Sequence, residues 1–238
     1  MSVARSPLDE ARFGIASARS SVSNLAEMDE VMTFCEAEAI RFLIARCPAQ
    51  ELRLVQHMEQ RGFLLMDTLL YYARRVDQTW PTVPHRLRLA TEADAEQIKE
   101  IAVEAFRGYG GHYHADARLD PALCDDLYVD WAYRSCTVRG VADAVLVSED
   151  DTRTTGFVTL RRNNPMEGEI MLSGVSPAAQ GQGLGRSLII GALDQGAIMG
   201  MERMIVSTQI TNLASQKIWS RLGFDVAHAY YTFHRWFD

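Results

Sequence analysis

Three glycines within five residues mark the part of the sequence whose chemistry is easiest to interpret. Gly181, Gly183 and Gly185 stand in the segment Val175–Ser187, between a predicted strand and a predicted helix. Glycine lets a backbone turn tightly and approach a ligand closely. Successive backbone N–H groups and the start of the following helix together attract an anion. The segment therefore predicts a binding site for a pyrophosphate or a similar group.

Two common phosphate-binding motifs do not fit this segment. A P-loop has Lys and then Ser or Thr after its last glycine, whereas Arg186 and Ser187 follow Gly185 here. A dinucleotide fingerprint needs glycine at the position of Arg186 and an acidic residue after the next strand, and both are missing. The remaining pattern is Gln180-x-x-Gly183-x-Gly185. Taken alone, it also suits a glycine-rich surface turn.

The elements around the glycine segment alternate between strand and helix periodicities. Thr91 and Asp94 resemble a capping box, and Pro121 suits the first turn of another helix. The polar turn Asp150–Arg153 is typical of a hairpin. The predicted strands are 86–90, 143–149, 154–162, 169–176, 204–209 and 224–236, and the predicted helices are 91–106, 121–135, 184–200 and 212–222. The predicted order is β-α-α-β-β-β-α-β-α-β, with a loop at 107–120.

Two prolines predict a division of the chain. Pro81 and Pro84 block the continuation of helix and strand, so residues 78–84 are a predicted linker. It separates an N-terminal domain, residues 1–77, from a C-terminal domain, residues 85–238, which has an ordinary single-domain size.

The N-terminal domain contains a partial echo of residues 202–236. In segment 41–75, Ile44 precedes Gly62 by 18 residues, and Ile205 precedes Gly223 by the same 18. Each of these glycines closes a predicted helix and is followed by Phe. The echo indicates a half-copy of the C-terminal module, with a chance match of two strand-helix-strand units as the alternative. Residues 19–24, where a phosphate turn would fall, lack glycine, so the half-copy is not expected to bind that ligand.

Composition limits the classes of function. The chain has 238 residues and a net charge of −7, which disfavours a nucleic-acid surface. No apolar run is long enough to cross a membrane, and residues 1–14 do not resemble a signal peptide. The cysteines, Cys35, Cys47, Cys124 and Cys136, lack metal-ligand spacing and are expected to be reduced thiols. No metal site is predicted. We expect a cytoplasmic protein.

The glycine pattern and the order of elements together resemble the GCN5-related N-acetyltransferase (GNAT) family. Gln180-x-x-Gly183-x-Gly185 looks like the coenzyme A pyrophosphate loop of that family, and Thr208–Phe224 looks like its second cofactor segment. The resemblance implies an α/β (α+β) GNAT fold with a mixed central sheet flanked by helices. It also implies acetyl-CoA, or another short-chain acyl-CoA, as co-substrate of an N-acetyltransferase.

Four further segments resemble one subgroup of the family, the nucleotide-sugar N-acetyltransferases of the dTDP-fucosamine acetyltransferase type. These segments are HYHADARLD (112–120), LYVDWAYRS (127–135), STQITNLASQKIW (207–219) and YYTFHRW (230–236). The subgroup implies a truncated GNAT-like N-terminal domain, a nucleotide-linked amino sugar as acceptor and a homodimer. The sugar substrate is carried by this resemblance alone.

The resemblance assigns expected roles to residues of this chain. The predicted coenzyme-binding residues are Leu172, Ser173, Gly174, Val175, Gln180, Gly181, Gln182, Gly183, Leu184, Gly185, Arg186, Ser187, Asn212, Ser215 and Trp219. The backbone N–H of Val175 is expected to polarise the thioester carbonyl. The predicted substrate-binding residues are His112, Tyr113, His114, Arg118, Trp131 and Arg134.

The proton-transfer residues are open at the level of sequence. His112 and His114 are candidate bases, because histidine titrates near neutral pH, although a loop histidine also suits sugar contact. Trp219 stands where the subgroup has an acidic Tyr, and an indole N–H does not serve as a proton donor. Tyr230 or Tyr231 is the candidate replacement. Alternatively, the thiolate leaves without help, since thiols titrate near 8.5.

Three functions follow from these patterns. The first is transfer of an acetyl or short acyl group to a nucleotide-linked amino sugar. The second is acetylation of another small amine, an amino acid or a protein N-terminus. The third is a coenzyme A sensor without catalysis, which the tryptophan at position 219 suggests.

Overall fold

A computed structural model describes residues 3–76, 79–150 and 153–237. Two predicted features lie partly outside the described residues. They are the junction between the N-terminal domain and the linker, at residues 77 and 78, and the centre of the hairpin turn, at residues 151–152. Within these ranges, no helix is both long and apolar enough to cross a bilayer.

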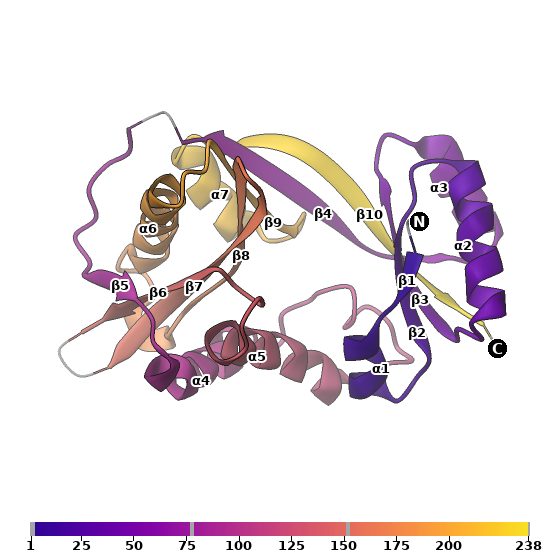
Figure 1. The fold of residues 1–238 in the computed structure, drawn as a ribbon, viewed down its shortest axis with the longest axis horizontal. Coiled ribbons are helices and arrows are strands. Elements are labelled where there is room, and N and C mark those ends of the chain that lie inside the picture. The colour runs from indigo at the N-terminus through magenta and orange to yellow at the C-terminus, as the bar shows by residue number, and fades with distance from the viewer. Residues whose placement is uncertain (1–2, 77–78, 151–152, 238) are drawn as a thin grey trace. The chain divides into compact units, whose positions relative to one another are not determined.

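The chain is a mixture of strands and helices, which alternate strictly only as far as residue 75 and from residue 167 onwards (Figure 1). The strands are β1 (Val3–Arg5), β2 (Ser17–Ser21), β3 (Phe42–Pro48), β4 (Leu64–Arg75), β5 (Leu87–Leu89), β6 (Ala144–Glu149), β7 (Thr154–Asn164), β8 (Glu167–Val175), β9 (Arg203–Gln209) and β10 (Asp225–Trp236). The helices are α1 (Pro7–Phe13), α2 (Leu25–Ala37), α3 (Leu52–Gln60), α4 (Ala95–Ala105), α5 (Pro121–Thr137), α6 (Leu184–Ile198) and α7 (Leu213–Arg221). From β5 to β10 the order is the predicted β-α-α-β-β-β-α-β-α-β, so this prediction is confirmed.

Contacts divide the chain into two compact units that are discontinuous in sequence. The first unit comprises residues 1–70, 110–124 and 228–238, and the second comprises 71–109 and 125–227. Strands β4 and β10 therefore each contribute to both units. The predicted boundaries at residues 77 and 85 assign 110–124 and 228–238 to the C-terminal domain, whereas the contacts group these two segments with residues 1–70. The division at residues 77 and 85 itself stays a prediction.

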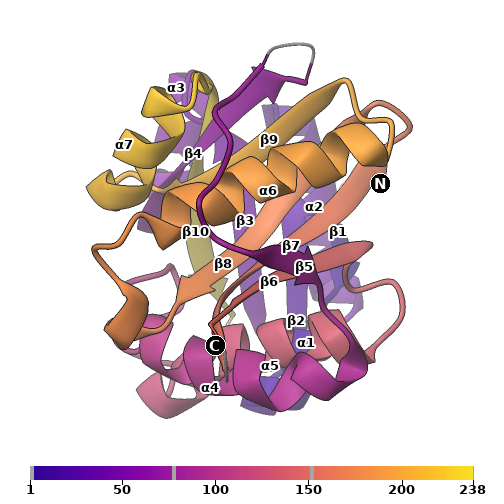
Figure 2. The same cartoon turned by 90° about the vertical axis from the view of Figure 1, so that its left-hand side faces the viewer.

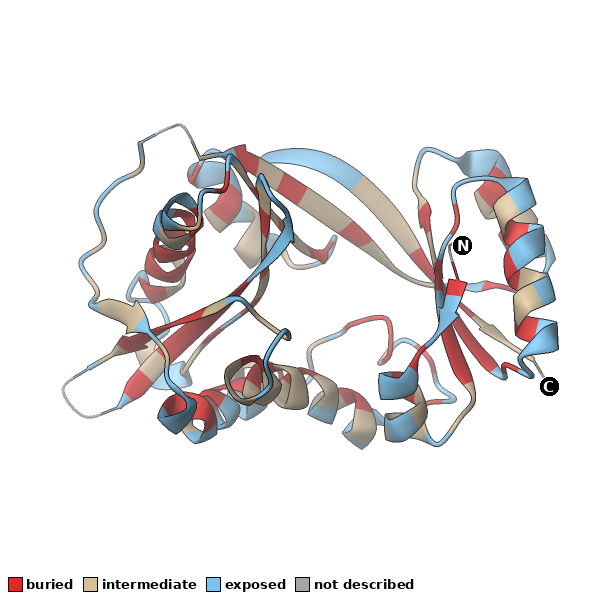
Figure 3. Ribbon diagram, in the orientation of Figure 1, coloured by how far each residue is buried: buried red, intermediate tan, exposed pale blue. Residues whose placement is uncertain are grey.

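The first unit is a mixed sheet with two helices on one face. Its strand order is β1-β2-β3-β10, in which β2 and β3 run parallel and β10 runs antiparallel to β3. Apolar side chains of α2 and α3, among them Met28 and Met58, pack with Phe233 of β10 in one core. The buried side of α2 is turned towards the strands (Figure 3). Alternation along β10 places Tyr231 on this core face and Tyr230 on the other.

The second unit is also a mixed sheet, with helices on both faces. Strands β5 to β8 are antiparallel neighbours, and β9 pairs parallel with β8. Helix α4 packs on one face, in a core that includes Ile98, Phe157 and Leu172. Helix α6 crosses the other face (Figure 2), where Leu184 and Leu188 approach Gly156 of β7. The fold therefore supports the glycine segment, at the start of α6, between two well-packed elements.

The sequence echo has a structural counterpart in two β-α-β motifs. The motif β3-α3-β4 has elements of 7, 9 and 12 residues, and β9-α7-β10 has elements of the same lengths. The two helices end before Gly62 and Gly223, which adopt left-handed φ values of 76° and 77°. The two strand-helix-strand segments therefore match element by element.

Candidate active site

The start of α6 leaves a series of backbone donors without acceptors. Gly181 and Gly183 adopt left-handed φ values of 76° and 83°, which glycine accepts at little cost. Gly183 is the N-cap, and no side chain caps the helix. The first bond into the helix runs from the Ser187 N–H to the Gly183 carbonyl, at 3.1 Å. Among the described residues, the N–H groups of 181–186 have no acceptor, so they are available to an anion.

The end of β8 offers a second row of backbone groups. Strand β8 pairs with β9 only as far as Ile170 and Val206. On its other side it stays paired with β7, and the Ser176 N–H donates to the Thr155 carbonyl at 2.9 Å. Because bonded and non-bonded pairs alternate in an antiparallel ladder, the N–H of Val175 points away from β7, towards the edge that β9 has left. Its carbonyl accepts a hydrogen bond from Gln180 Nε2 at 3.3 Å.

A β-bulge lies where β8 separates from β9. The register with β7 shifts between Thr159 and Leu160, so Met171 is the extra residue of β8. The N–H of Leu172 donates to the buried side-chain oxygen of Thr159 at 3.1 Å. Bulges bend a strand and redirect its backbone groups, and they are common beside active sites. The bulge therefore contributes to the open edge from residue 171 to 175.

Three elements converge on Gly185. A Cβ built on this residue would lie 3.9 Å from Cγ2 of Val175 and 3.8 Å from Cδ1 of Ile218. The start of α6, the end of β8 and helix α7 therefore meet, and the two rows of backbone groups belong to one site. Nearby, the Ser187 hydroxyl is buried and lies 2.7 Å from Nδ1 of His85, so that side chain is already engaged.

The remaining residues of this segment differ in exposure. Ser173 is exposed, whereas Gly174 is buried, and a Cβ there would lie 2.6 Å from the Phe157 ring. Gln180 and Gln182 are exposed on the turn. All of the predicted coenzyme-binding residues therefore lie in the second unit, although they differ in exposure.

Helix α7 begins with a polar cluster. Asn212 caps the helix by accepting from the Ser215 N–H at 3.2 Å, and its Nδ2 donates to Thr208 Oγ1 at 3.0 Å. The Tyr109 hydroxyl lies 3.3 Å from Thr208 Oγ1 and donates to Gln209 Oε1. Sequence reasoning named Asn212 and Ser215 but missed Tyr109. No local pattern links it to β9, a hundred residues further along the chain.

Trp219 is a buried packing residue of α7. It is 5% exposed, and its ring meets that of Tyr72 edge to face at 5.4 Å. The Tyr72 hydroxyl donates to Gln216 of the same helix at 3.2 Å. Trp219 thus fixes α7 beside the site, a role compatible with forming a wall of the thiol pocket.

The predicted base His112 lies in the first unit, inside a buried chain of hydrogen bonds. Its Nδ1 is 2.9 Å from Nε2 of His234, and His234 Nδ1 is 2.7 Å from Oδ2 of Asp116. The indole N–H of Trp236 donates to the same Oδ2 at 2.9 Å. Burial, followed by the positive charges around it, holds the pKa of His112 well below its usual value. Burial raises the pKa of Asp116, but its hydrogen bonds to His234 and Trp236 outweigh burial and leave it lowered.

A second buried group adjoins this chain. The Tyr113 hydroxyl donates to Asp9 Oδ1 at 2.7 Å, and Arg19 holds both oxygens of that carboxylate at 2.7 and 2.9 Å. Arg19 also donates to the Tyr113 hydroxyl. His114 is half-buried nearby on the same loop. The segment 112–116 is therefore bound tightly to the first unit.

The other predicted substrate and acid residues are spread over both units. Arg118 stacks over Trp236 at 4.1 Å in the first unit, and Tyr231 packs against its core. Trp131 and Arg134 lie on the part of α5 in the second unit, where Arg134 pairs with Asp130 at 3.7 Å. The structure thus gathers the coenzyme set in one unit and most of the acceptor set in the other. The roles of all these residues stay predictions.

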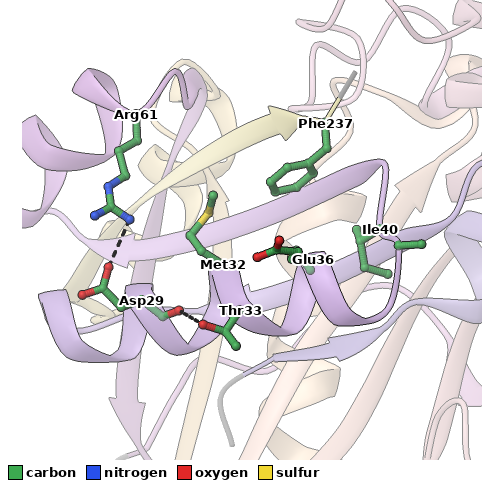
Figure 4. Close-up of a pocket in the computed structure, with 9 residues that line it drawn as sticks. Asp29, Met32, Thr33, Glu36, Ile40, Arg61 and Phe237 are labelled. Carbon is green, nitrogen blue, oxygen red and sulfur yellow. Dashed lines mark hydrogen bonds and ion pairs between the residues drawn. The ribbon is translucent and has the colours of Figure 1, made fainter.

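The first unit also contains a hollow whose lining includes none of the predicted site residues. The hollow has a volume of about 540 Å³ and is bordered by Met32, Ile40 and Phe237, with an Arg61–Asp29 ion pair of 3.0 Å at one end (Figure 4). In the described ranges, no group of three or more His, Cys, Asp and Glu side chains is placed to hold a metal ion.

Comparison with known families assigns the fold. The family model described as "Acetyltransferase (GNAT) family" matches residues 95–224, which is more than half of the chain and includes the glycine turn and α7. The chain belongs to this acetyltransferase family. The acetyltransferase accordingly uses acetyl-CoA as its acyl donor, and the free donors at the start of α6 fit the anionic end of that co-substrate.

Curated relatives are distant or partial. The spore coat polysaccharide biosynthesis protein SpsD of Bacillus subtilis is 22% identical over 92% of this chain and 75% of its own length. A mycothiol acetyltransferase of Mycobacteroides abscessus is 39% identical, but over 30% of this chain and 25% of its own. That match therefore covers about a quarter of the second relative.

Solved structures support the fold over nearly the whole chain. A tandem GNAT protein from the clavulanic acid biosynthesis pathway superimposes with a TM-score of 0.64 and 14% identity, covering 94% of this chain and 76% of its own. A GCN5-related N-acetyltransferase from Sphaerobacter thermophilus gives a TM-score of 0.61 at 15% identity, covering 92% and 73%. The predicted GNAT fold, with mixed sheets flanked by helices, is confirmed.

Proposed function

We propose that this acetyltransferase transfers an acetyl or short acyl group from coenzyme A to the amino group of a nucleotide-linked amino sugar. Acyl transfer from coenzyme A is supported by two rows of backbone groups. One row is the N–H groups of residues 181–186, which have no hydrogen-bond partner among the described residues, and the other is the edge of β8 that is no longer paired with β9 beyond Ile170. The choice of acceptor is supported by the subgroup resemblance and by SpsD, whose name places it in polysaccharide biosynthesis.

The coenzyme is held mainly by backbone groups. The N–H groups of 181–186 bind the pyrophosphate, and the half-buried Arg186 adds a cation to the first turn of α6. The pantetheine arm pairs as an extra strand segment with the open edge of β8, from Leu172 to Val175. This arrangement suits a chain of net charge −7, because fixed dipoles replace bulk positive charge.

The chain supplies position and a preorganised donor for the reaction. Coenzyme A provides an activated acetyl group, and a neutral amine attacks its carbonyl carbon. Negative charge then grows on the carbonyl oxygen, where the N–H of Val175, directed to the open edge, stabilises it. Alignment of both substrates provides much of the acceleration.

The reaction needs an acceptor for the proton of the amine and a fate for the departing thiolate. The amine loses a proton, for which His114 is the proposed acceptor. His112 is the weaker candidate, because burial lowers its pKa and its Nδ1 is already bonded to His234. The departing thiolate takes a proton from Tyr230, because Tyr231 packs against the core on the other face of β10. Alternatively, it leaves unprotonated, because a thiol of pKa about 8.5 is a competent leaving group near neutral pH.

Direct transfer is favoured over an acyl-enzyme. Burial raises the pKa of Cys35, Cys47 and Cys136 to about 11, the last two with a further contribution from a nearby carboxylate. A thiol acts as a nucleophile in its thiolate form, so these side chains are poorly suited to carry the acetyl group.

The test is release of free thiol when the protein is mixed with acetyl-CoA and a panel of dTDP- and UDP-linked amino sugars. We expect release with at least one of them, together with loss of one amine. Absence of release with every nucleotide-linked amino sugar, in protein shown to bind acetyl-CoA, would exclude the proposed acceptor.

A second candidate is acetylation of another small amine, an amino acid or a protein N-terminus. The local match to a mycothiol acetyltransferase favours it, because that match lies in a relative whose name gives a different acceptor. Release of thiol in a broad amine screen, without release on nucleotide sugars, would select it. Tight acetyl-CoA binding with no turnover on any amine would instead select a coenzyme sensor.

A further inference from the structure

One face of the sheet in the first unit carries an arginine that no carboxylate neutralises. Arg46 of β3 is half-buried, and in the described part of the chain its side chain makes no ion pair or hydrogen bond. The two carboxylates of the buried networks are already engaged. Asp9 is held by Arg19 and Tyr113, and Asp116 is held by His234 and Trp236. The positive charge of Arg46 is therefore uncompensated.

Two hydroxyl groups flank this arginine. Ser21 of β2 and Thr232 of β10 are the direct register partners of Arg46 on its two sides, so the three side chains share one face. Thr232 has no exposed surface, and its Oγ1 has no hydrogen-bond partner among the described residues. A buried hydroxyl without a partner is costly, so we expect a water molecule or a bound ligand to complete its hydrogen bonding. We call Ser21, Arg46 and Thr232 the cross-strand row.

His112 borders the cross-strand row. It is close enough for the charge of Arg46 to act on its imidazole, and its Nε2 has no partner in the described ranges. The hydrogen bond between Nδ1 of His112 and Nε2 of His234 holds one proton. Nε2 of His112 accordingly accepts a hydrogen bond when His234 is neutral and donates one when His234 is protonated. This end of the row therefore suits either a hydroxyl group or an oxyanion.

We propose that the cross-strand row, together with Nε2 of His112, binds the diphosphate of the acceptor substrate. A guanidinium fork between two hydroxyl groups matches a phosphate, with Thr232 at the floor and Ser21 at the exposed side. Nε2 of His112 then contacts a hydroxyl or phosphate oxygen beside it. The choice of a nucleoside diphosphate as ligand rests on the proposed function, whereas binding of the anion is measurable without acetyl transfer.

The site is tested by calorimetric titration of the full chain saturated with coenzyme A, so that the glycine turn is already occupied. The probes are UDP, dTDP and inorganic pyrophosphate. We expect Arg46→Ala to weaken binding of all three at least tenfold, Arg46→Lys to weaken it less, and Thr232→Val to weaken it about threefold. The matched control is Arg53→Ala on α3, which removes the same charge from an exposed position and is expected to leave affinity unchanged.

Each outcome has a defined meaning. Tighter binding of UDP or dTDP than of pyrophosphate supports a nucleotide acceptor at this site, and equal binding supports an anion site that recognises phosphate alone. No binding of any probe to the saturated protein, or an affinity that Arg46→Ala leaves intact, overturns the site. Failure of every amino sugar to accept acetyl, with diphosphate binding intact and dependent on Arg46, overturns the proposed function and leaves the site standing.

Discussion

The starts of α2 and α6 occupy comparable places, each after a strand that runs parallel to the next strand of its unit, yet they present opposite surfaces. At α2, Asn24 accepts from the Glu27 N–H at 3.0 Å, and Glu27 Oε2 accepts from the Ser23 N–H at 2.7 Å. At α6, Gly183 provides no cap and the N–H groups of 181–186 are unpaired. One helix start is closed by its own side chains and carries a negative charge, whereas the other is open to an anion.

The strands that precede these two helices also differ, because one stays paired with its parallel neighbour and the other does not. In the first unit, β2 stays paired with β3 along its whole length, from Ser17 to Ser21. In the second, β8 leaves β9 after Ile170. A shared β-α-β framework thus exposes backbone donors in the second unit through two local changes, an uncapped glycine turn and a separated strand pair. These two changes create the surface that we propose binds coenzyme A.

The largest expected effect comes from closing α6 in the manner of α2. The double variant Gly183→Asn, Arg186→Glu introduces at α6 the two side chains that cap α2, and it replaces a cation by a carboxylate beside the proposed pyrophosphate site. We expect acetyl-CoA affinity to fall at least a hundredfold in a calorimetric titration. The free energy of unfolding should fall by about 1 kcal/mol, because a side chain at the left-handed φ of Gly183 is strained.

Gly14→Ala is the matched control for backbone strain. Gly14 has a left-handed φ of 67° in the first unit, with no atom within 4 Å of an added Cβ. This variant should lose stability and keep its affinity for acetyl-CoA. Normal coenzyme binding by the capped double variant would refute the account of the open helix start.

The next effect concerns the helices of the two β-α-β motifs. Trp219 of α7 stands at the position that Met58 occupies in α3, and both are buried. Trp219→Met removes the edge-to-face contact with Tyr72 and leaves unfilled volume, so we expect a loss of about 2–3 kcal/mol in urea unfolding. The KM for acetyl-CoA should rise several-fold because α7 borders the site. A loss of stability without any change in KM would restrict Trp219 to packing.

A smaller effect is expected at the bulge of β8. Thr159→Val keeps the shape of the side chain and removes the acceptor for the Leu172 N–H. A buried donor left unpaired costs about 1–3 kcal/mol. We expect unfolding at lower urea and a slower acetyl transfer, because the open edge of β8 loses its support. Thr33→Val, which removes a hydroxyl from an exposed position of α2, is the control and should change neither quantity.

The smallest expected effect is the pH dependence of stability that the buried His112 of the first unit causes. The depressed pKa of His112 means that the unfolded chain takes up a proton near pH 6.5 that the folded chain refuses. Stability should therefore fall as pH decreases below about 6.5, by at most roughly 1.4 kcal/mol per pH unit from this group. His112→Gln should flatten the urea-unfolding profile between pH 7.5 and 5.5, whereas exposed His228→Gln should not. Parallel profiles for wild type and His112→Gln would contradict the assignment.

Local patterns predicted the elements and the glycine turn, because both depend on short-range properties. The order from β5 to β10 and the left-handed turn at Gly62 and Gly223 follow from periodicity and glycine placement. Local patterns did not predict the hydrogen bonds between residues that are far apart in the sequence. His112 bonds to His234, 122 residues away, and Tyr109 bonds to Gln209, 100 residues away. Neither spacing has a periodic signal, so the discontinuous units and the cluster around Asn212 were not predicted.

The sharing of β10 between the units has a consequence for synthesis on the ribosome. Domains commonly fold in the order in which they are made. Here β3 gains its antiparallel neighbour, from Tyr230 to Trp236, nearly two hundred residues after it is translated. Until then, the apolar side of β3 and the helices that cover it form an incomplete sheet with an unsatisfied edge. During that interval the nascent N-terminal segment is a natural client for chaperones, and completion of the first unit coincides with the arrival of β10.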